Sequence, residues 1–169
     1  ELSSINRRKA SMNPDIIRTL FDYHYSLFDR VWESVAEISE EQFNDEIAYS
    51  RGSIRHQLFH ASFAESGWLR GIQGTPRDQI GPYNPDDYPT KAAVKSFYEN
   101  GKATMRAYLA NLDQAEIERV PEGLMGPVWQ IMLHLVNHGT DHRAQVLRVL
   151  HDFGAPTFDQ DMILHLWNI

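Results

Sequence analysis

The sequence contains no cysteine among its 169 residues. This absence excludes disulfide bonds, a cysteine nucleophile, iron–sulfur clusters and zinc sites with thiolate ligands. Any metal ion held by the protein must therefore be bound by histidine, aspartate or glutamate side chains. The sequence offers 8 histidines and 23 acidic residues for this purpose.

Long apolar runs and a surplus of basic residues are also missing. No segment approaches the ~20 apolar residues that a membrane-spanning helix needs, and the first residues lack the apolar core of a signal peptide. The 16 Lys and Arg against 23 Asp and Glu give a formal net charge of −7, and the one basic cluster is Arg7, Arg8 and Lys9. We therefore expect a cytoplasmic protein that binds neither nucleic acid nor a membrane surface.

Four segments show apolar residues at helical spacing, with no competing strand pattern and no internal repeat. They cover about residues 14–38, 53–72, 90–112 and 126–154. The chain has the length of one domain, so the sequence predicts an all-α four-helix bundle with a long connection between the second and third helices. Residues 1–12 are a polar lead-in whose composition permits disorder, and residues 13–169 are assigned to a single four-helix-bundle domain.

Capping residues mark the ends of these helices. Asn13 stands before Pro14 at the start of the first helix, and Ser53 and Thr90 stand where they can cap the second and third. The segment from Ser39 to Gln42 has the pattern of a capping box, which predicts a short additional turn. Gly, Pro and Asp are frequent over residues 71–89, as is typical of a long irregular connection.

Three histidines four residues apart, His134, His138 and His142, lie in the fourth helix. On a helical wheel His142 falls in the middle of the apolar stripe, His138 on its flank and His134 on its edge. Two inward imidazoles one turn apart can share one metal ion at ~2.1 Å. A pair of hydrogen-bonded core histidines has the same pattern, so the wheel leaves both interpretations open.

A second group lies in the second helix, where His56 and His60 are also four residues apart. His60 is surrounded by small residues, which suit either a metal ion or a close helix contact. Glu65 falls in the centre of the apolar stripe, where a carboxylate must be paired, protonated or metal-bound, and both a structural and a functional role are open. Paired Glu-x-x-His motifs are absent, which excludes a di-iron bundle.

The two motifs HLVNHGTDHRAQVLRVLHDFG and SIRHQLFHASFAESGWL resemble the signature helices of the DinB/YfiT-like superfamily of metalloenzymes. The resemblance implies a four-helix bundle, commonly a homodimer, with a divalent metal, nickel or zinc, on three histidines. The matching residues here are His60, His138 and His142. His56 and His134 then lie outside the metal shell.

The resemblance also implies a class of chemistry. Relatives with assigned activities include transferases and isomerases that use small thiols such as bacillithiol or mycothiol, and many members have no known activity. Since this chain has no cysteine, a thiol must arrive as a cosubstrate. We expect a small-thiol S-transferase in which Glu65 and Gln145 act as base, orienting group or partner of a metal ligand, with Glu65 as the candidate catalytic residue. The alternatives are a metal-dependent hydrolase and a non-catalytic, metal-stabilised bundle.

Several other residues have a structural interpretation beside a functional one. His24 lies on the apolar face of the first helix, as a hydrogen-bonded core residue or as part of a pocket lining. The segment that carries Tyr83 and Tyr88 is an ordinary surface connection or a lid. Because ligand imidazoles must be neutral, we expect metal affinity to fall below about pH 6. No role is assigned to His151, His165, Asp159 or Asp161.

Overall fold

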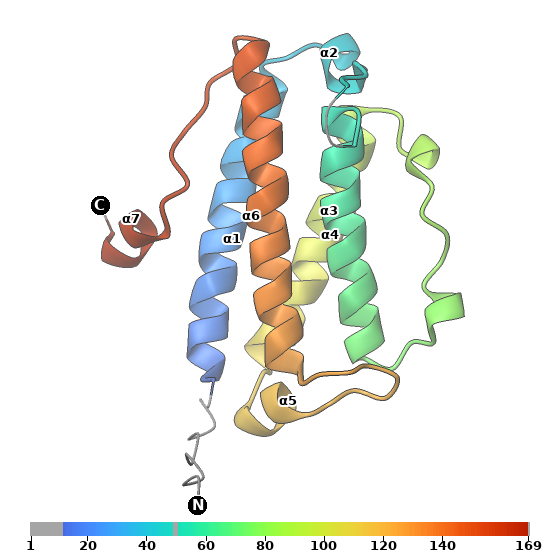
Figure 1. Ribbon diagram of the computed structural model, residues 1–169, viewed down its shortest axis with the longest axis vertical. Helices are drawn as coiled ribbons and strands as arrows, with labels where there is room; N and C mark the ends of the chain where they lie inside the picture. Colours follow the sequence, from blue (N-terminus) through green and yellow to red (C-terminus); the bar gives the residue numbers. More distant parts are fainter. Residues whose placement is uncertain (1–11, 49–50, 169) are drawn as a thin grey trace, which may run out of the picture.

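The computed structural model describes residues 12–48 and 51–168, and every regular element in these residues is helical (Figure 1). The prediction of an all-α protein is confirmed. The predicted lead-in, residues 1–12, lies outside the described residues except for Met12. Within the described residues, no helix is both long and apolar enough to cross a membrane.

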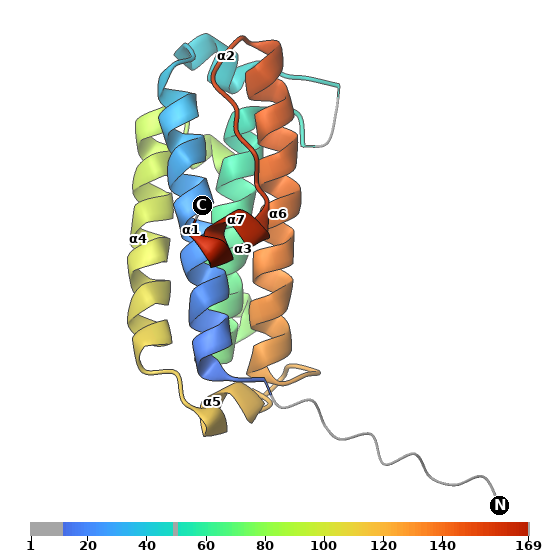
Figure 2. The ribbon, with the colours of Figure 1, turned by 90° about the vertical axis from the view of Figure 1, so that its left-hand side faces the viewer.

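Four long helices lie side by side (Figures 1 and 2). They are α1 (Pro14–Ala36), α3 (Ile54–Ile72), α4 (Lys91–Ala110) and α6 (Val128–Asp152). The short helices are α2 (Glu40–Asn44), α5 (Gln114–Glu118) and α7 (Met162–Trp167), with the 3-10 turns η1 (Arg77–Gln79) and η2 (Pro85–Asp87). Helix α1 packs against α6 and α4, and α3 packs against α4 and α6.

The predicted caps are present. The side chains of Asn13, Ser53 and Thr90 each accept a hydrogen bond from a backbone N–H in the first turn of their helix. Ser39 and Gln42 form the reciprocal capping box that begins α2. Because a side-chain cap contributes about 1 kcal/mol to stability, capping residues occur where helices begin. These helix starts could therefore be predicted from the sequence.

Apolar side chains from the four long helices meet in one core. Its most buried members include Ile17, Phe21, Tyr25, Val31, Leu58, Ile72, Val94, Met105, Val146 and Leu150. Each such burial stabilises the fold by about 1.5–3 kcal/mol. Helix α1 ends at Ala36 rather than near residue 38, and Ile38 still packs into the core from the link to α2.

The long connection between α3 and α4 folds back along α3 (Figure 1). Arg55 of α3 donates a hydrogen bond to the carbonyl oxygen of Pro85 at 2.6 Å, and Arg70 donates to the carbonyl oxygens of Gln79 and Ile80. The ring of Tyr88 stacks on Phe59 at 4.7 Å between centroids. These contacts fix the connection as a wall along α3, from Arg55 near its start to Arg70 near its end.

The C-terminal segment crosses α1 and α6 (Figure 2). Tyr23 donates a hydrogen bond to the carbonyl oxygen of Gln160, and Arg143 donates to the Gln160 side chain. The guanidinium of Arg30 lies 3.9 Å from the centroid of the Phe158 ring. Asp161 stands at the N-cap position of α7, although its side chain forms no cap hydrogen bond.

Candidate metal centre

Three histidine side chains converge between α3 and α6. His60 comes from α3, and His138 and His142 come from α6; one ring nitrogen of each lies within 4.8 Å of the others. The Nε2 atom of His138 is 3.3 Å from that of His60 and 3.0 Å from that of His142. Three nitrogens bound to one ion at ~2.1 Å in tetrahedral geometry are about 3.4 Å apart, so the cluster is close to a binding arrangement.

The helices explain this convergence. His138 and His142 are one turn apart on α6, so both project from the same face toward α3. His60 projects from the face of α3 that packs against α6. The structure therefore brings together the three histidines that the sequence predicts as ligands.

A chain of hydrogen bonds fixes the tautomer of His142. The Asp141 carboxylate can only accept, so the Gln145 amide N–H donates to it at 3.0 Å. The Gln145 amide oxygen then accepts from the Gln57 amide N–H at 2.9 Å, which leaves the Gln57 amide oxygen facing Nδ1 of His142 at 2.6 Å. Nδ1 of His142 therefore carries the proton, and Nε2 keeps its lone pair for a metal ion.

Gln57 was not identified from the sequence, whereas Gln145 was. Gln57 lies one turn before His60 on α3 and is buried at 2% exposure. On the helical wheel it falls between the apolar stripe and His60. A glutamine in that position has no distinguishing pattern until the facing helix supplies His142.

The three imidazoles are held in the neutral form. Burial, which disfavours the charged imidazolium, lowers the pKa of His60 to about 3 and that of His142 to about 4. Burial also lowers the pKa of His138. Neutral imidazole is the form that binds metal, so affinity should persist below the pH of about 6 that unperturbed histidines imply.

His56 and His134 lie outside the cluster. His56 has Nδ1 at 3.3 Å from the carbonyl oxygen of Arg51 and Nε2 at 3.0 Å from a guanidinium nitrogen of Arg55. The His134 ring lies edge-on to Trp68. Both histidines thus have other partners.

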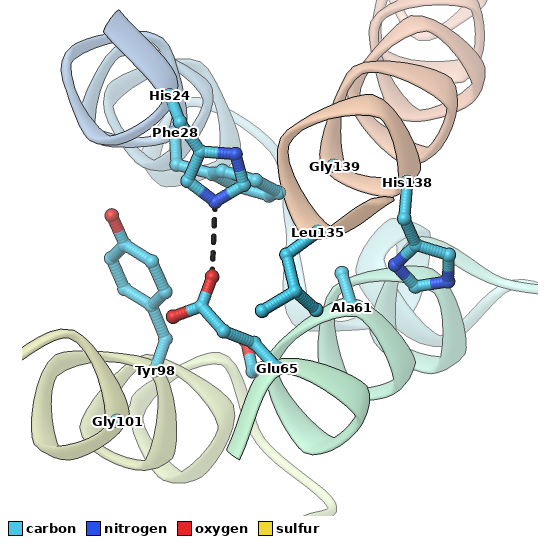
Figure 3. A pocket seen from close by; sticks show the side chains of 10 residues that line it. His24, Phe28, Ala61, Glu65, Tyr98, Gly101, Leu135, His138 and Gly139 are labelled. Carbon is cyan, nitrogen blue, oxygen red and sulfur yellow. Dashed lines mark hydrogen bonds and ion pairs between the residues drawn. The ribbon is translucent and has the colours of Figure 1, made fainter. Parts of the chain in front are cut away.

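Glu65 is paired on the other side of α3. Its carboxylate accepts a hydrogen bond from the Tyr25 hydroxyl at 2.6 Å and lies 3.1 Å from Nε2 of His24. In Figure 3 the carboxylate turns toward His24, and Leu135 separates it from His138 in this view. Glu65 is not part of the three-histidine cluster, and its catalytic role stays a prediction.

A buried arginine completes this second network. Arg143 of α6 has no exposed surface, and its guanidinium nitrogen lies 3.3 Å from Nδ1 of His24. Because a guanidinium can only donate, Nδ1 of His24 accepts and Nε2–H donates to Glu65. Burial lowers the pKa of His24 in spite of the Glu65 carboxylate. His24 is therefore a hydrogen-bonded core residue, one of the two interpretations that the sequence leaves open.

A small cavity lies between the two networks (Figure 3). It is lined by His24, Phe28, Ala61, Ser62, Glu65, Tyr98, Gly101, Leu135, His138 and Gly139. Its volume of about 10 Å³ has room for about one water molecule. His24 and Glu65 thus line the same cavity as His138. His24 is therefore also a pocket-lining residue, which is the second interpretation that the sequence leaves open.

The similarity of this chain to known proteins extends over nearly its whole length. The sequence matches the model of the DinB family over residues 10–168. It is also similar to the protein DinB of Bacillus subtilis (strain 168), with 26% identity over 163 residues. The aligned region covers 90% of this chain and 95% of that protein.

Proposed function

Since the chain belongs to the DinB family, and since three histidine nitrogens converge in it, we propose that it binds one divalent metal ion and uses it in catalysis. The ligands in this proposal are His60, His138 and His142. The observation that carries it is the convergence of three neutral ring nitrogens, with the His142 tautomer already fixed by Gln57.

The donor set suits zinc or nickel. Imidazole nitrogen is a good ligand for both ions, whereas magnesium and calcium prefer oxygen. None of the described acidic side chains belongs to the cluster, so three protein ligands leave a coordination position for a small molecule. When bound, the ion keeps its full double charge and lowers the pKa of a water or thiol at that position.

The reaction we propose is the transfer of a chemical group to or from the sulfur atom of a small thiol. The chain has no cysteine, so the sulfur must come from the cosubstrate, and this chain's own residues hold, orient and shield it. Gln57 orients His142, and Tyr83 on the connection between α3 and α4 lies edge-on to His60, beside the open position. A metal-dependent hydrolase uses the same open position with water in place of the thiol.

A non-catalytic role is the second candidate, because the three ligands come from two different helices. An ion between α3 and α6 cross-links elements that are 78 residues apart in sequence at the His60–His138 contact.

The proposal further includes a four-helix bundle formed by α1, α3, α4 and α6, a homodimer, and a cytoplasmic location.

Metal content tests the proposed site. Protein purified without a nickel column should carry about one divalent ion per chain, and His138→Ala should lose it because two ligands rarely retain an ion. His134→Ala, one turn earlier on the same helix, is the matched control and should keep the metal. Full metal occupancy in His138→Ala, measured by elemental mass spectrometry, would contradict the assignment.

Cobalt substitution distinguishes the proposed enzymatic role from the non-catalytic scaffold role. Co²⁺ accepts the same ligands, and its absorption reports a new sulfur bond when a thiol takes the open position. A fourth protein ligand would close the site and prevent this change. If the metal is retained and no small thiol alters the cobalt spectrum, the thiol-transferase proposal should give way to the hydrolase or the scaffold.

A further inference from the structure

A second cavity lies between α3, α4 and the connection that joins these two helices (Figure 1). Its volume is about 260 Å³, close to the lower end of the range of about 300–1,000 Å³ for small-molecule pockets. None of the three clustered histidines lines it. The cavity is therefore a separate place where a small ligand can bind.

The floor of this cavity is apolar. It consists of the buried or half-buried side chains of Phe63, Leu69, Ile80 and Phe97. The rings of Phe63 and Phe97 both pack on the buried ring of Phe59, at 5.8 and 5.2 Å between centroids, so their positions are fixed. A floor with two fixed aromatic rings favours a ligand that has a flat apolar ring of its own.

Polar side chains surround the floor. Ser66 of α3 and Asn100 of α4 line the cavity. Within residues 12–48 and 51–168, neither side chain forms a hydrogen bond, so both are available to a ligand. Among the described residues that line the cavity, Arg70 is the only charged one, and the cavity therefore has a positive side and no negative one.

Arg70 keeps donors free although it holds the connection in place. Its two terminal nitrogens donate to the carbonyl oxygens of Ile80 and Gln79 at 2.9 and 2.8 Å. A guanidinium carries five N–H donors, so three of them remain. Carbonyl oxygens carry no net charge, and in the part of the chain that the structure describes Arg70 forms no ion pair. Its position is thus fixed while its charge is not compensated.

We propose that this cavity binds a small aromatic carboxylate, with the ring on the apolar floor and the carboxylate at Arg70. Burial of the ring between α3 and α4 supplies the apolar part of the affinity. The guanidinium supplies a positive charge and planar donors that match a carboxylate. Because the three histidines take no part, the inference does not rest on the proposed metal site.

Three probes separate the contribution of the ring from that of the charge. Phenylacetate has both, 2-phenylethanol has the ring without the charge, and acetate has the charge without the ring. Each is titrated into the isotope-labelled, full-length protein, and the amide shifts in NMR spectra give both the affinity and the location. Phenylacetate should bind most tightly, with its largest shifts at residues 63–73 and 97–104. No saturable shifts in these two segments would overturn the inference.

Removal of the charge tests the carboxylate. Arg70→Gln should weaken phenylacetate by about three- to tenfold, the range for a partly exposed charge pair, and should leave 2-phenylethanol unchanged. Arg77→Gln makes the same charge change on the exposed turn η1, outside the cavity lining, and should change neither affinity. Because Arg70 also holds the connection, 2-phenylethanol reports any change in the shape of the cavity. Equal weakening of both probes by Arg70→Gln would overturn the assignment of the carboxylate.

A filled cavity tests the location. Thr104 is exposed on α4, and its hydroxyl donates to the carbonyl oxygen of Asn100 in the same helix, so a larger side chain fits there without disturbing the core. Thr104→Phe should weaken phenylacetate and 2-phenylethanol together, by about tenfold or more. Phenylacetate bound to a metal ion on the three histidines would survive Thr104→Phe. That result would overturn the cavity assignment and leave the proposed metal site standing.

Discussion

Gln57 connects His142 of the metal cluster to two further polar side chains of α6, Gln145 and Asp141. It accepts from Nδ1 of His142 and donates to Gln145, which in turn donates to Asp141. Because each step in this chain allows only one direction of donation, the orientation of the His142 ring is set before a metal ion arrives. Because the His142 ring is already oriented, metal binding loses less conformational entropy than it would with a freely rotating ring.

Replacing Gln57 should therefore weaken metal binding without touching a ligand. We expect Gln57→Leu to reduce metal affinity by about 10- to 100-fold, the usual effect of losing the partner of a ligating histidine. Competition with a chelator measures the change. Gln145→Leu acts one step further away and should have the smaller effect; equal affinity in Gln57→Leu and native protein would contradict the role given to this glutamine.

Acid should destabilise the metal-free protein through the same histidines. Burial lowers the pKa of His60 to about 3 and of His142 to about 4 from 6.5, so between these values the unfolded chain binds more protons than the folded one. The free energy of unfolding then falls as the pH decreases below about 6.5.

Urea denaturation of the metal-free protein at pH 7.5, 6.5 and 5 measures this slope. His60→Leu should flatten it, because one group with a lowered pKa is removed. His151→Leu, which replaces an exposed histidine near the end of α6, is the control and should keep the native slope. A His60→Leu slope as steep as that of the native protein would show that other groups dominate.

At the scale of the helices, the contact between α1 and α6 depends on Gly139. A Cβ atom at this position would lie 2.3 Å from Cε1 of His24 and 3.1 Å from the Phe28 ring. The His24 ring is enclosed by the rings of Phe21, Tyr25 and Phe28, so it cannot move aside cheaply. The glycine thus allows α6 to approach α1 closely enough for Arg143, His24 and Glu65 to form one network.

Gly139→Ala should be destabilising although alanine is the better helix former. We expect a loss of about 2–4 kcal/mol, from the overpacked contact and the broken hydrogen bonds of His24. Gly71→Ala, where an added Cβ meets only Leu124 at 4.0 Å, should instead gain about 0.5–1 kcal/mol. Denaturant unfolding compares the two, and a Gly139→Ala protein as stable as Gly71→Ala would refute the close-approach argument.

Elements with local signals were predictable, and those that depend on a partner were not. The starts of α3 and α4 could be predicted from Ser53 and Thr90, because an N-cap is an interaction between residues close in sequence. Helix α5 was missed, although Asp113 caps it, because five residues show no periodicity. The four-residue spacing of His138 and His142 is likewise local, whereas the choice of His60 over His56 came from the family resemblance.

The network around Arg143 could not be predicted from the sequence, because its partners come from other segments of the chain. Arg143 directly follows His142 and resembles any surface arginine of a helix until α1 supplies His24 and the C-terminal segment supplies Gln160. Glu65 was recognised as unusual from its place in the apolar stripe, but its partners Tyr25 and His24 belong to another helix.

At the scale of the whole molecule, the core and the metal cluster make separate contributions to stability. Apolar residues from α1, α3, α4 and α6 are buried together, and the three histidines occupy one contact between α3 and α6. A core of this extent does not require a cross-link, unlike the small zinc-dependent domains that unfold without metal. We therefore expect the metal-free protein to fold.

Metal addition should still raise its thermal stability, because only the folded chain brings the three ligands together. At a free zinc concentration of about 100 times the dissociation constant, the gain is about 2.7 kcal/mol, or roughly 5–10 °C for a chain of this length. Scanning calorimetry with and without zinc measures the shift; His138→Ala should abolish it and His134→Ala should preserve it. A metal-free protein with no cooperative transition would instead mean that the ion holds α3 and α6 together, which is the behaviour of the scaffold and not of an enzyme with an exchangeable position.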